Sequence, residues 1–163
     1  MKIRLTTVLF CLLTALAVSG AVFFIRYAKF SISGASVLEI RDDDSGKLYG
    51  SWALEKNGEF AIEFIHSVNQ GPVRETFRVD GGLLKPLSVR FTSFGAGMQS
   101  DLLEGMSFDQ DGDYMILTGF DSSFDELSYI VGTVSDHLLF INGETISLRD
   151  LCGRNAHITF KVR

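Results

Sequence analysis

The chain has 163 residues, of which 46% are apolar and 21% charged, and its formal net charge is −5. This length fits one domain with a short appendage, and the apolar fraction excludes a mainly disordered chain. The charge is unevenly distributed, because the first 29 residues carry +4 and the remainder carries −9. Nucleic acid is therefore not an expected partner, since binding it needs clustered Lys and Arg.

The first expected element is a membrane-spanning helix. Residues 5–25 contain no charged side chain. Basic residues flank this run on both sides, Lys2 and Arg4 before it and Arg26 and Lys29 after it. About 20 apolar residues are enough to cross a bilayer as a helix. A signal peptide cleaved after small residues near Ala21 is the alternative. The uncleaved anchor is favoured because the apolar run continues past that point.

These features divide the chain into a membrane anchor or signal segment, residues 1–29, and a β-rich domain, residues 30–163. Short basic N-termini normally stay in the cytoplasm, so we expect the domain on the outer, periplasmic side of the cytoplasmic membrane. Cleavage of the segment would instead release a secreted form.

The second region is predicted to be all-β, a single small antiparallel sandwich or barrel. Apolar and polar residues alternate with a period close to two, which is typical of half-buried strands. Asn57-Gly58, Asp111-Gly112 and Asn142-Gly143 are typical of tight hairpin turns. Short helical turns are expected at 100–105 and 148–153. The expected strands are 37–41, 47–54, 60–65, 76–80, 87–92, 114–118, 127–134, 137–141, 145–148 and 158–163.

The main candidate site begins where the strand 60–65 ends. His66 and Ser67 open a loop that leads to Pro72 and Glu75. The functional interpretation takes His66 as an acid, base or ligand, Ser67 as a hydroxyl and Glu75 as a carboxylate. Adjacent residues of an extended chain face opposite ways, so His66 and Ser67 are not expected to form a nucleophile–base pair. The structural alternative is a tight reversal in which the His and Glu side chains form hydrogen bonds to the backbone. We expect that the protein is not an enzyme.

Three other motifs have a structural and a functional interpretation. Gly95 and Gly97 belong to a Gly-rich reversal, which favours a sharp turn over an anion-binding nest. The acidic run 109–113 fails the calcium-loop pattern twice, which favours an exposed hairpin. The cysteine of the β-domain, Cys152, is expected to be a small core residue. The three histidines lack metal-ligand spacing, so neither a metal nor a cofactor is expected.

Three ordered blocks resemble a bacterial family known as domain of unknown function 1850. They are Phe64-Ile-His-Ser-Val68, Pro72-Val-Arg-Glu75 and Phe91-Thr-Ser-Phe-Gly-Ala-Gly97, and the resemblance spans about residues 37–163. The chain departs from the family pattern at Met98-Gln99, where Leu-Pro is expected. The resemblance implies a genomic setting beside TRAP-type solute transporters that use a TAXI-type binding protein and move organic acids and similar solutes.

The resemblance implies no catalytic residue, but six residues match the family's blocks and form the candidate binding site: His66, Ser67, Pro72, Glu75, Gly95 and Gly97. It implies a membrane-anchored accessory protein that contacts the TRAP permease or the TAXI-type binding protein. The alternative is an extracytoplasmic module that binds a small ligand or metal, with His66 and Glu75 at the mouth of a barrel.

Overall fold

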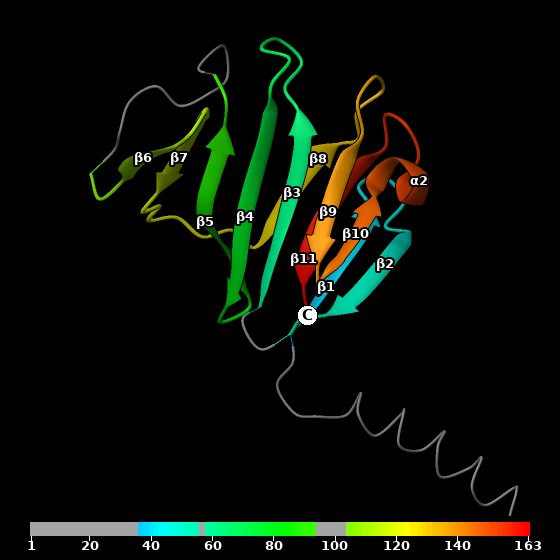
Figure 1. The fold of residues 1–163 in the computed structure, drawn as a ribbon. Helices are drawn as coiled ribbons and strands as arrows, with labels where there is room; N and C mark the ends of the chain where they lie inside the picture. The colour runs from blue at the N-terminus through cyan, green and yellow to red at the C-terminus, as the bar shows by residue number, and fades with distance from the viewer. Residues whose placement is uncertain (1–35, 56–57, 94–103) are drawn as a thin grey trace, which may run out of the picture. The chain divides into compact units, whose positions relative to one another are not determined.

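Two antiparallel sheets form the computed structural model, which describes residues 36–55, 58–93 and 104–163 (Figure 1). The smaller sheet has the order β2 (Leu48–Ala53), β1 (Val37–Asp42), β11 (His157–Val162) and β8 (Glu126–Ile130). The larger sheet has the order β10 (Glu144–Ser147), β9 (His137–Ile141), β3 (Glu59–Ile65), β4 (Pro72–Asp80), β5 (Leu83–Phe91), β7 (Tyr114–Thr118) and β6 (Ser107–Asp111).

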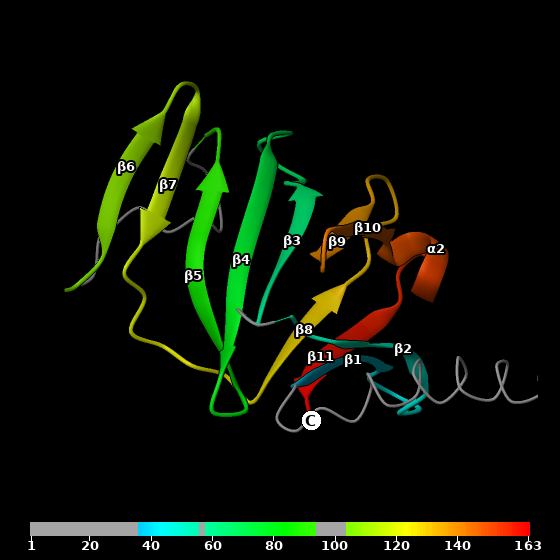
Figure 2. The same cartoon turned by 60° about the horizontal axis from the view of Figure 1, so that its bottom comes forward.

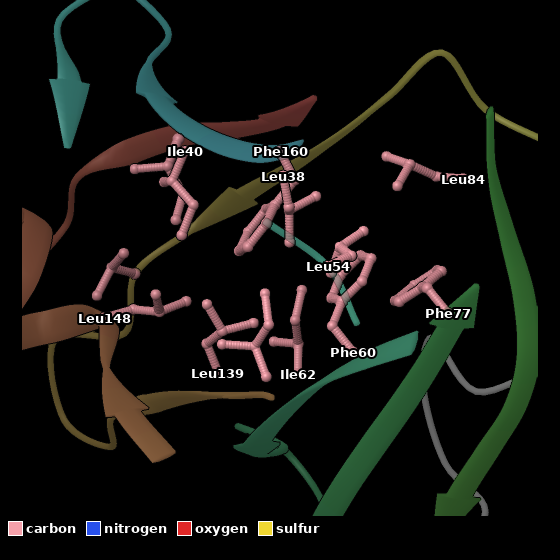
Figure 3. Packing of buried hydrophobic residues seen from close by; sticks show 13 residues of the cluster. Leu38, Ile40, Leu54, Phe60, Ile62, Phe77, Leu84, Leu139, Leu148 and Phe160 are labelled. Atoms are coloured by element: carbon pink, nitrogen blue, oxygen red, sulfur yellow. The ribbon is translucent and has the colours of Figure 1, made fainter. Parts of the chain in front are cut away.

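The inward side chains of the two sheets pack against each other in one buried cluster (Figure 3). Ile40 and Phe160 of the small sheet and Ile62 of the large sheet are almost fully buried. The Phe60 ring stacks on Phe77 at 5.4 Å and on Phe160 at 6.1 Å between centroids. Burying each such side chain contributes about 1.5–3 kcal/mol. The predicted all-β class is confirmed, with the two sheets arranged as a sandwich.

The large sheet extends past the small one on the side of β5, β7 and β6 (Figure 2). A second, smaller buried cluster lies there, formed by Val73, Phe91 and Leu117. Phe64 packs against this cluster and also against the main one. The inner face of β4 therefore passes from one apolar cluster to the other along its length.

Two of the three predicted hairpin turns are present, at Asp111-Gly112 between β6 and β7 and at Asn142-Gly143 between β9 and β10. The hairpin predicted at Asn57-Gly58 is wrong, because the strands before and after it, β2 and β3, lie in different sheets. Asn142 and Gly143 have φ values of 51° and 78°, the left-handed conformations that a tight turn between β9 and β10 needs. The Asn142 side chain donates to Ala53 O at 2.7 Å and accepts from Glu55 N at 3.2 Å. This turn therefore also fixes the end of β2 against the opposite sheet.

The structure shortens one predicted strand and adds another. The run 127–134 ends as a strand at Ile130, because the chain then leaves the small sheet to begin β9 in the large one. The exposed strand β6 was not among the predicted strands, since its sequence lacks an apolar alternation, but with β7 it forms the exposed hairpin predicted at 109–113. The expected helical turn is present as α2 (Leu148–Cys152), and the Ser147 hydroxyl accepts from Asp150 N at its start.

Two predictions concern parts of the chain that the structure does not describe. The anchor of residues 1–29 lies outside the described residues, and so does most of the predicted turn at 100–105. Within residues 36–55, 58–93 and 104–163, no helix is long and apolar enough to cross a membrane.

Candidate functional site

The predicted loop after β3 forms one wall of a cavity of about 460 Å³. The loop is a tight reversal, since His66 N donates to Gly71 O at 2.9 Å and Gln70 N donates to His66 O at 2.9 Å. The opposite wall is the loop 131–136, which joins β8 of the small sheet to β9 of the large sheet. His66 and Ser67 both line the cavity, so two of the predicted site residues share one hollow.

The imidazole of His66 is held by its own loop. Its Nδ1 atom accepts hydrogen bonds from Val68 N and Asn69 N, each at 3.3 Å. A ring nitrogen that accepts from an N–H carries no proton, so the neutral ring carries its proton on Nε2. The loop thus fixes the tautomer of His66 and leaves Nε2–H as its remaining donor.

His137 opens β9 and lines the same cavity, and its ring stacks on Phe64 at 5.0 Å between centroids. Its Nδ1 atom accepts from Gly132 N at 3.1 Å, so this ring also presents Nε2–H. Gly132 is required here because a Cβ atom at this position would clash with the backbone oxygen of Ser135. Burial lowers the pKa of His137, which keeps the ring neutral.

The loop 131–136 is anchored from behind by the start of α2. The Asp136 carboxylate accepts from the Ser147 hydroxyl and from Arg149 N, the latter at 3.0 Å. The guanidinium of Arg149 donates through Nη2 to Val134 O at 2.9 Å. These bonds hold the cavity wall without using any atom of the two imidazoles.

Glu75 lies away from the lining of this cavity, although the sequence groups it with His66. It follows Val73 and precedes Phe77 on the inward face of β4, where its neighbours in the sheet are Ile62 and Val89. The Tyr129 hydroxyl of β8 donates to Glu75 Oε2 at 2.5 Å and so joins the two sheets. Burial raises the pKa of Glu75, against the smaller opposing effect of the bond from Tyr129.

Tyr129 connects the buried carboxyl to the edge of the cavity. Its ring meets Phe160 edge-on at 5.6 Å and His137 edge-on at 6.3 Å between centroids. Burial raises the pKa of the Tyr129 hydroxyl, and the nearby Glu75 raises it further, so the group remains a donor. The interior pair and the cavity are therefore adjacent but separate.

The remaining predicted site residues are not all brought together. Pro72 begins β4 opposite Ile65 and closes the hairpin without lining the cavity. Gly95 and Gly97 lie outside the described residues.

The described part of the cavity is rich in hydrogen-bond donors. Within the described residues, no hydrogen bond joins the Ser67 hydroxyl to an imidazole, and no group of three or more His, Cys, Asp and Glu residues is placed to hold a metal ion. Cys152, the thiol of the described β-domain, packs against the core and is not among the described lining residues, and burial raises its pKa to about 11. The cavity is suited to hydrogen bonding and apolar contact.

A second cavity of about 320 Å³ lies on the outer face of the large sheet. Its lining includes Arg74, whose guanidinium lies over the Phe140 ring at 4.0 Å and 3.6 Å from Glu63. The main charged group of this cavity is thus already paired and stacked. The cavity between the two loops is the better candidate, because its donors remain available.

Several residues of the site were not predicted as such. Gln70, Thr133 and Ser135 line the cavity, and Tyr129 is the partner of Glu75. The sequence does hold one usable signal: Glu75 occupies an inward position in the alternation of β4, which indicates a buried carboxyl. The meeting of the loops 66–71 and 131–136 depends on strand order, which the sequence alone did not reveal.

Comparison with known proteins identifies one family. A family model described as a domain of unknown function, DUF1850, matches residues 60–148. This range runs from β3 to the start of α2 and contains both loops of the cavity. No curated protein and no solved structure matches the chain.

Proposed function

The chain belongs to the DUF1850 family, and we propose on that basis that it is a membrane-anchored accessory protein of a TAXI-type TRAP solute transporter. Residues 5–25 would hold it in the cytoplasmic membrane with the β-domain outside. It would act by contact with the permease or the TAXI-type binding protein and not by catalysis. The family resemblance supports the choice of partner, and the surface around the cavity supports the mode of action.

One observation carries the proposal: exposed apolar side chains gather on the two loops of the cavity. Val134 is 92% exposed, Val68 is 65% exposed and Ile65 is 40% exposed. Ile65 and Val134 also line the cavity, and Val68 lies on the same loop as His66. Apolar area removed from water on binding contributes roughly 25 cal/mol per Å², so this edge is a suitable contact surface.

Both loops are already held in one conformation by hydrogen bonds. His66 fixes the first through its ring and backbone, and Asp136 with Arg149 fixes the second. A surface ordered before binding loses less conformational entropy when a partner docks. This supports a recognition surface built into the fold.

Affinity purification of the full-length protein from detergent-solubilised native membranes tests the proposal. We compare the wild type with Val134→Asp, and with Leu48→Asp as a matched control. Leu48 is 43% exposed and lies on β2 of the other sheet. We expect the permease or binding protein with the wild type and Leu48→Asp, and at least tenfold less with Val134→Asp. Failure to recover either partner with the wild type, or equal recovery with Val134→Asp, would overturn the proposal.

A second candidate function, a small-ligand-binding module, is favoured by the cavity itself. Its 460 Å³ lies within the range of small-molecule sites, about 300–1,000 Å³. Two imidazoles with fixed tautomers line it, His66 from the loop after β3 and His137 from the start of β9. A thermal-shift screen of small organic molecules on the full-length protein tests this function. Absence of any shift would count against it.

A further inference from the structure

We propose that the cavity between the loops 66–71 and 131–136 binds the carboxylate of a small organic acid with a short apolar body, held by the Nε2–H groups of His66 and His137. This inference rests on the second candidate function above and names the class of its ligand.

Hydrogen bonds at Nδ1 fix the orientation of both imidazoles. In each ring Nδ1 accepts from backbone N–H groups, those of Val68 and Asn69 for His66 and that of Gly132 for His137. Each ring therefore presents a donor at Nε2 and no free acceptor. Two such donors in one cavity match a group with two acceptor oxygens, and a carboxylate forms stronger bonds than a neutral carbonyl.

The rest of the described lining is polar without carrying negative charge. The described lining residues include no Asp or Glu, and the hydroxyls of Ser67 and Thr133 can donate, whereas the Ser135 hydroxyl donates to Ile65 O at 3.5 Å. The Gln70 amide is held inside its own loop, since its Nε2 donates to Ser67 O at 2.5 Å. Nothing among these lining residues would repel an anion.

The guanidinium of Arg149 lies behind the cavity wall. Arg149 donates through Nη2 to Val134 O, while its Nε is buried without a hydrogen-bond partner. Among the described residues Arg149 forms no side-chain ion pair, and the nearby Asp136 carboxylate accepts from the Ser147 hydroxyl and the Arg149 backbone N–H. Asp136 and Arg149 act on His137 in opposite directions, with the carboxylate the stronger of the two, so the guanidinium offsets part of the negative charge behind the wall that would disfavour an anion.

The apolar part of the lining determines the chemical character of the ligand beyond its carboxylate. Phe64, Ile65 and Val134 contribute apolar surface to the cavity. A ligand that places its carboxylate on the imidazoles can place a short alkyl body against these side chains. Amphipathic small acids therefore fit better than inorganic anions, which offer no apolar surface.

Histidine NMR on the full-length protein tests this inference directly. The chain has three histidines, and the third, His157, lies exposed on β11 and does not line the cavity. With the Cε1 atoms isotopically labelled, each histidine gives one signal, and His157 serves as an internal reference. The probes are butanoate, butanamide and 1-butylamine, which share an alkyl chain and differ in the head group.

The variants His66→Asn and His137→Asn remove the proposed donors and keep the local structure. The Asn side-chain oxygen replaces Nδ1 as acceptor for the loop N–H groups, while the Nε2–H donor is lost. We expect saturable butanoate shifts at His66 and His137, absent at His157, and about tenfold weaker binding in each variant. His157→Asn is the control and should bind as the wild type does. Circular dichroism checks folding, and His66→Asn alone decides if His137→Asn unfolds.

The outcomes separate the ligand class from the binding function. Shifts of His66 and His137 with butanamide or butylamine but not with butanoate would overturn the carboxylate and leave the small-ligand function standing. Absence of a shift with all three probes would overturn both. Equal shifts of all three histidines would show unspecific binding and overturn the inference, as would unchanged affinity in His66→Asn.

Discussion

Two neighbouring polar regions of the sandwich differ in how they are satisfied. Inside, Glu75 of the large sheet accepts from Tyr129 of the small sheet, and burial shifts the pKa of both groups upward. At the edge, His66 and His137 each use one ring nitrogen to hold a loop and keep the other available. The edge rings line an open cavity, and the interior pair does not.

Residues that the sequence analysis grouped in one candidate site therefore have different roles. A polar pair that joins the two sheets affects stability first, because an unmade bond there leaves a largely desolvated group with little access to water. A donor that faces a cavity affects binding first, because water can solvate it when the ligand is absent. Variants of the two regions should therefore separate loss of stability from loss of binding.

Tyr129→Phe should give the largest effect, because it removes the donor from a buried carboxyl while keeping the ring. We expect a loss of about 2 kcal/mol in the free energy of unfolding. Tyr49→Phe is the matched control, since the Tyr49 hydroxyl donates to Asp42 at 2.8 Å, and hydrogen bonds affect the pKa of that carboxyl more than burial does, unlike at Glu75. It should cost less than Tyr129→Phe, because Asp42 keeps the hydrogen bonds from Ser45 N and Ser45 Oγ and water can replace the lost donor. Urea denaturation measures both. Equal losses would contradict the contrast in burial.

Glu75→Gln should act in the opposite direction and depend on pH. The folded chain holds the Glu75 proton to higher pH than the unfolded chain, because burial raises its pKa above 4.5. Wild-type stability is therefore lost as pH rises through that raised pKa, whereas Gln has no proton to lose. We expect similar stabilities at pH 4 and a gain of about 1 kcal/mol for Glu75→Gln at pH 8.

Urea denaturation at several pH values measures this gain, and Glu63→Gln on the outer face of β3 is the control. Glu63 is only partly buried and lies 3.6 Å from Arg74, so its replacement should not reproduce a gain confined to high pH. A gain of Glu75→Gln that is independent of pH would show that ionisation of this carboxyl is not its cause.

Much of the fold could be predicted from the sequence because period-two patterns and turn residues are local signals. The strands of residues 114–118 and 137–141 have the predicted bounds, and the Asn142-Gly143 turn has the predicted form. The strand β6 could not be found in this way, because its exposed residues SFDQD lack alternation and its pairing with β7 makes it a strand. The run after Ile130 was wrong as a strand, because the chain changes sheets there.

The candidate site could be predicted only in part. His66 and Ser67 are signalled by a strand end and a loop, which are local features. The role of His137 depends on the pairing of β9 with β3, which places His137 next to Phe64 on the neighbouring strand. Glu75 and Tyr129 meet across two sheets and 54 positions of sequence, so only the tertiary structure shows their bond.

His66→Asn should give the smallest change in stability and thereby sharpen the comparison most. The Asn oxygen can accept from Val68 N and Asn69 N as Nδ1 does, so the loop keeps its hydrogen bonds. We expect the free energy of unfolding to stay within about 0.5 kcal/mol of the wild type. Urea denaturation checks this, with His66→Leu as the control that removes acceptor and donor together. A larger loss for His66→Asn than for His66→Leu would mean that the ring itself supports the fold, and the edge would then resemble the interior. A loss confined to His66→Leu assigns Nδ1 to the loop and leaves Nε2–H for recognition.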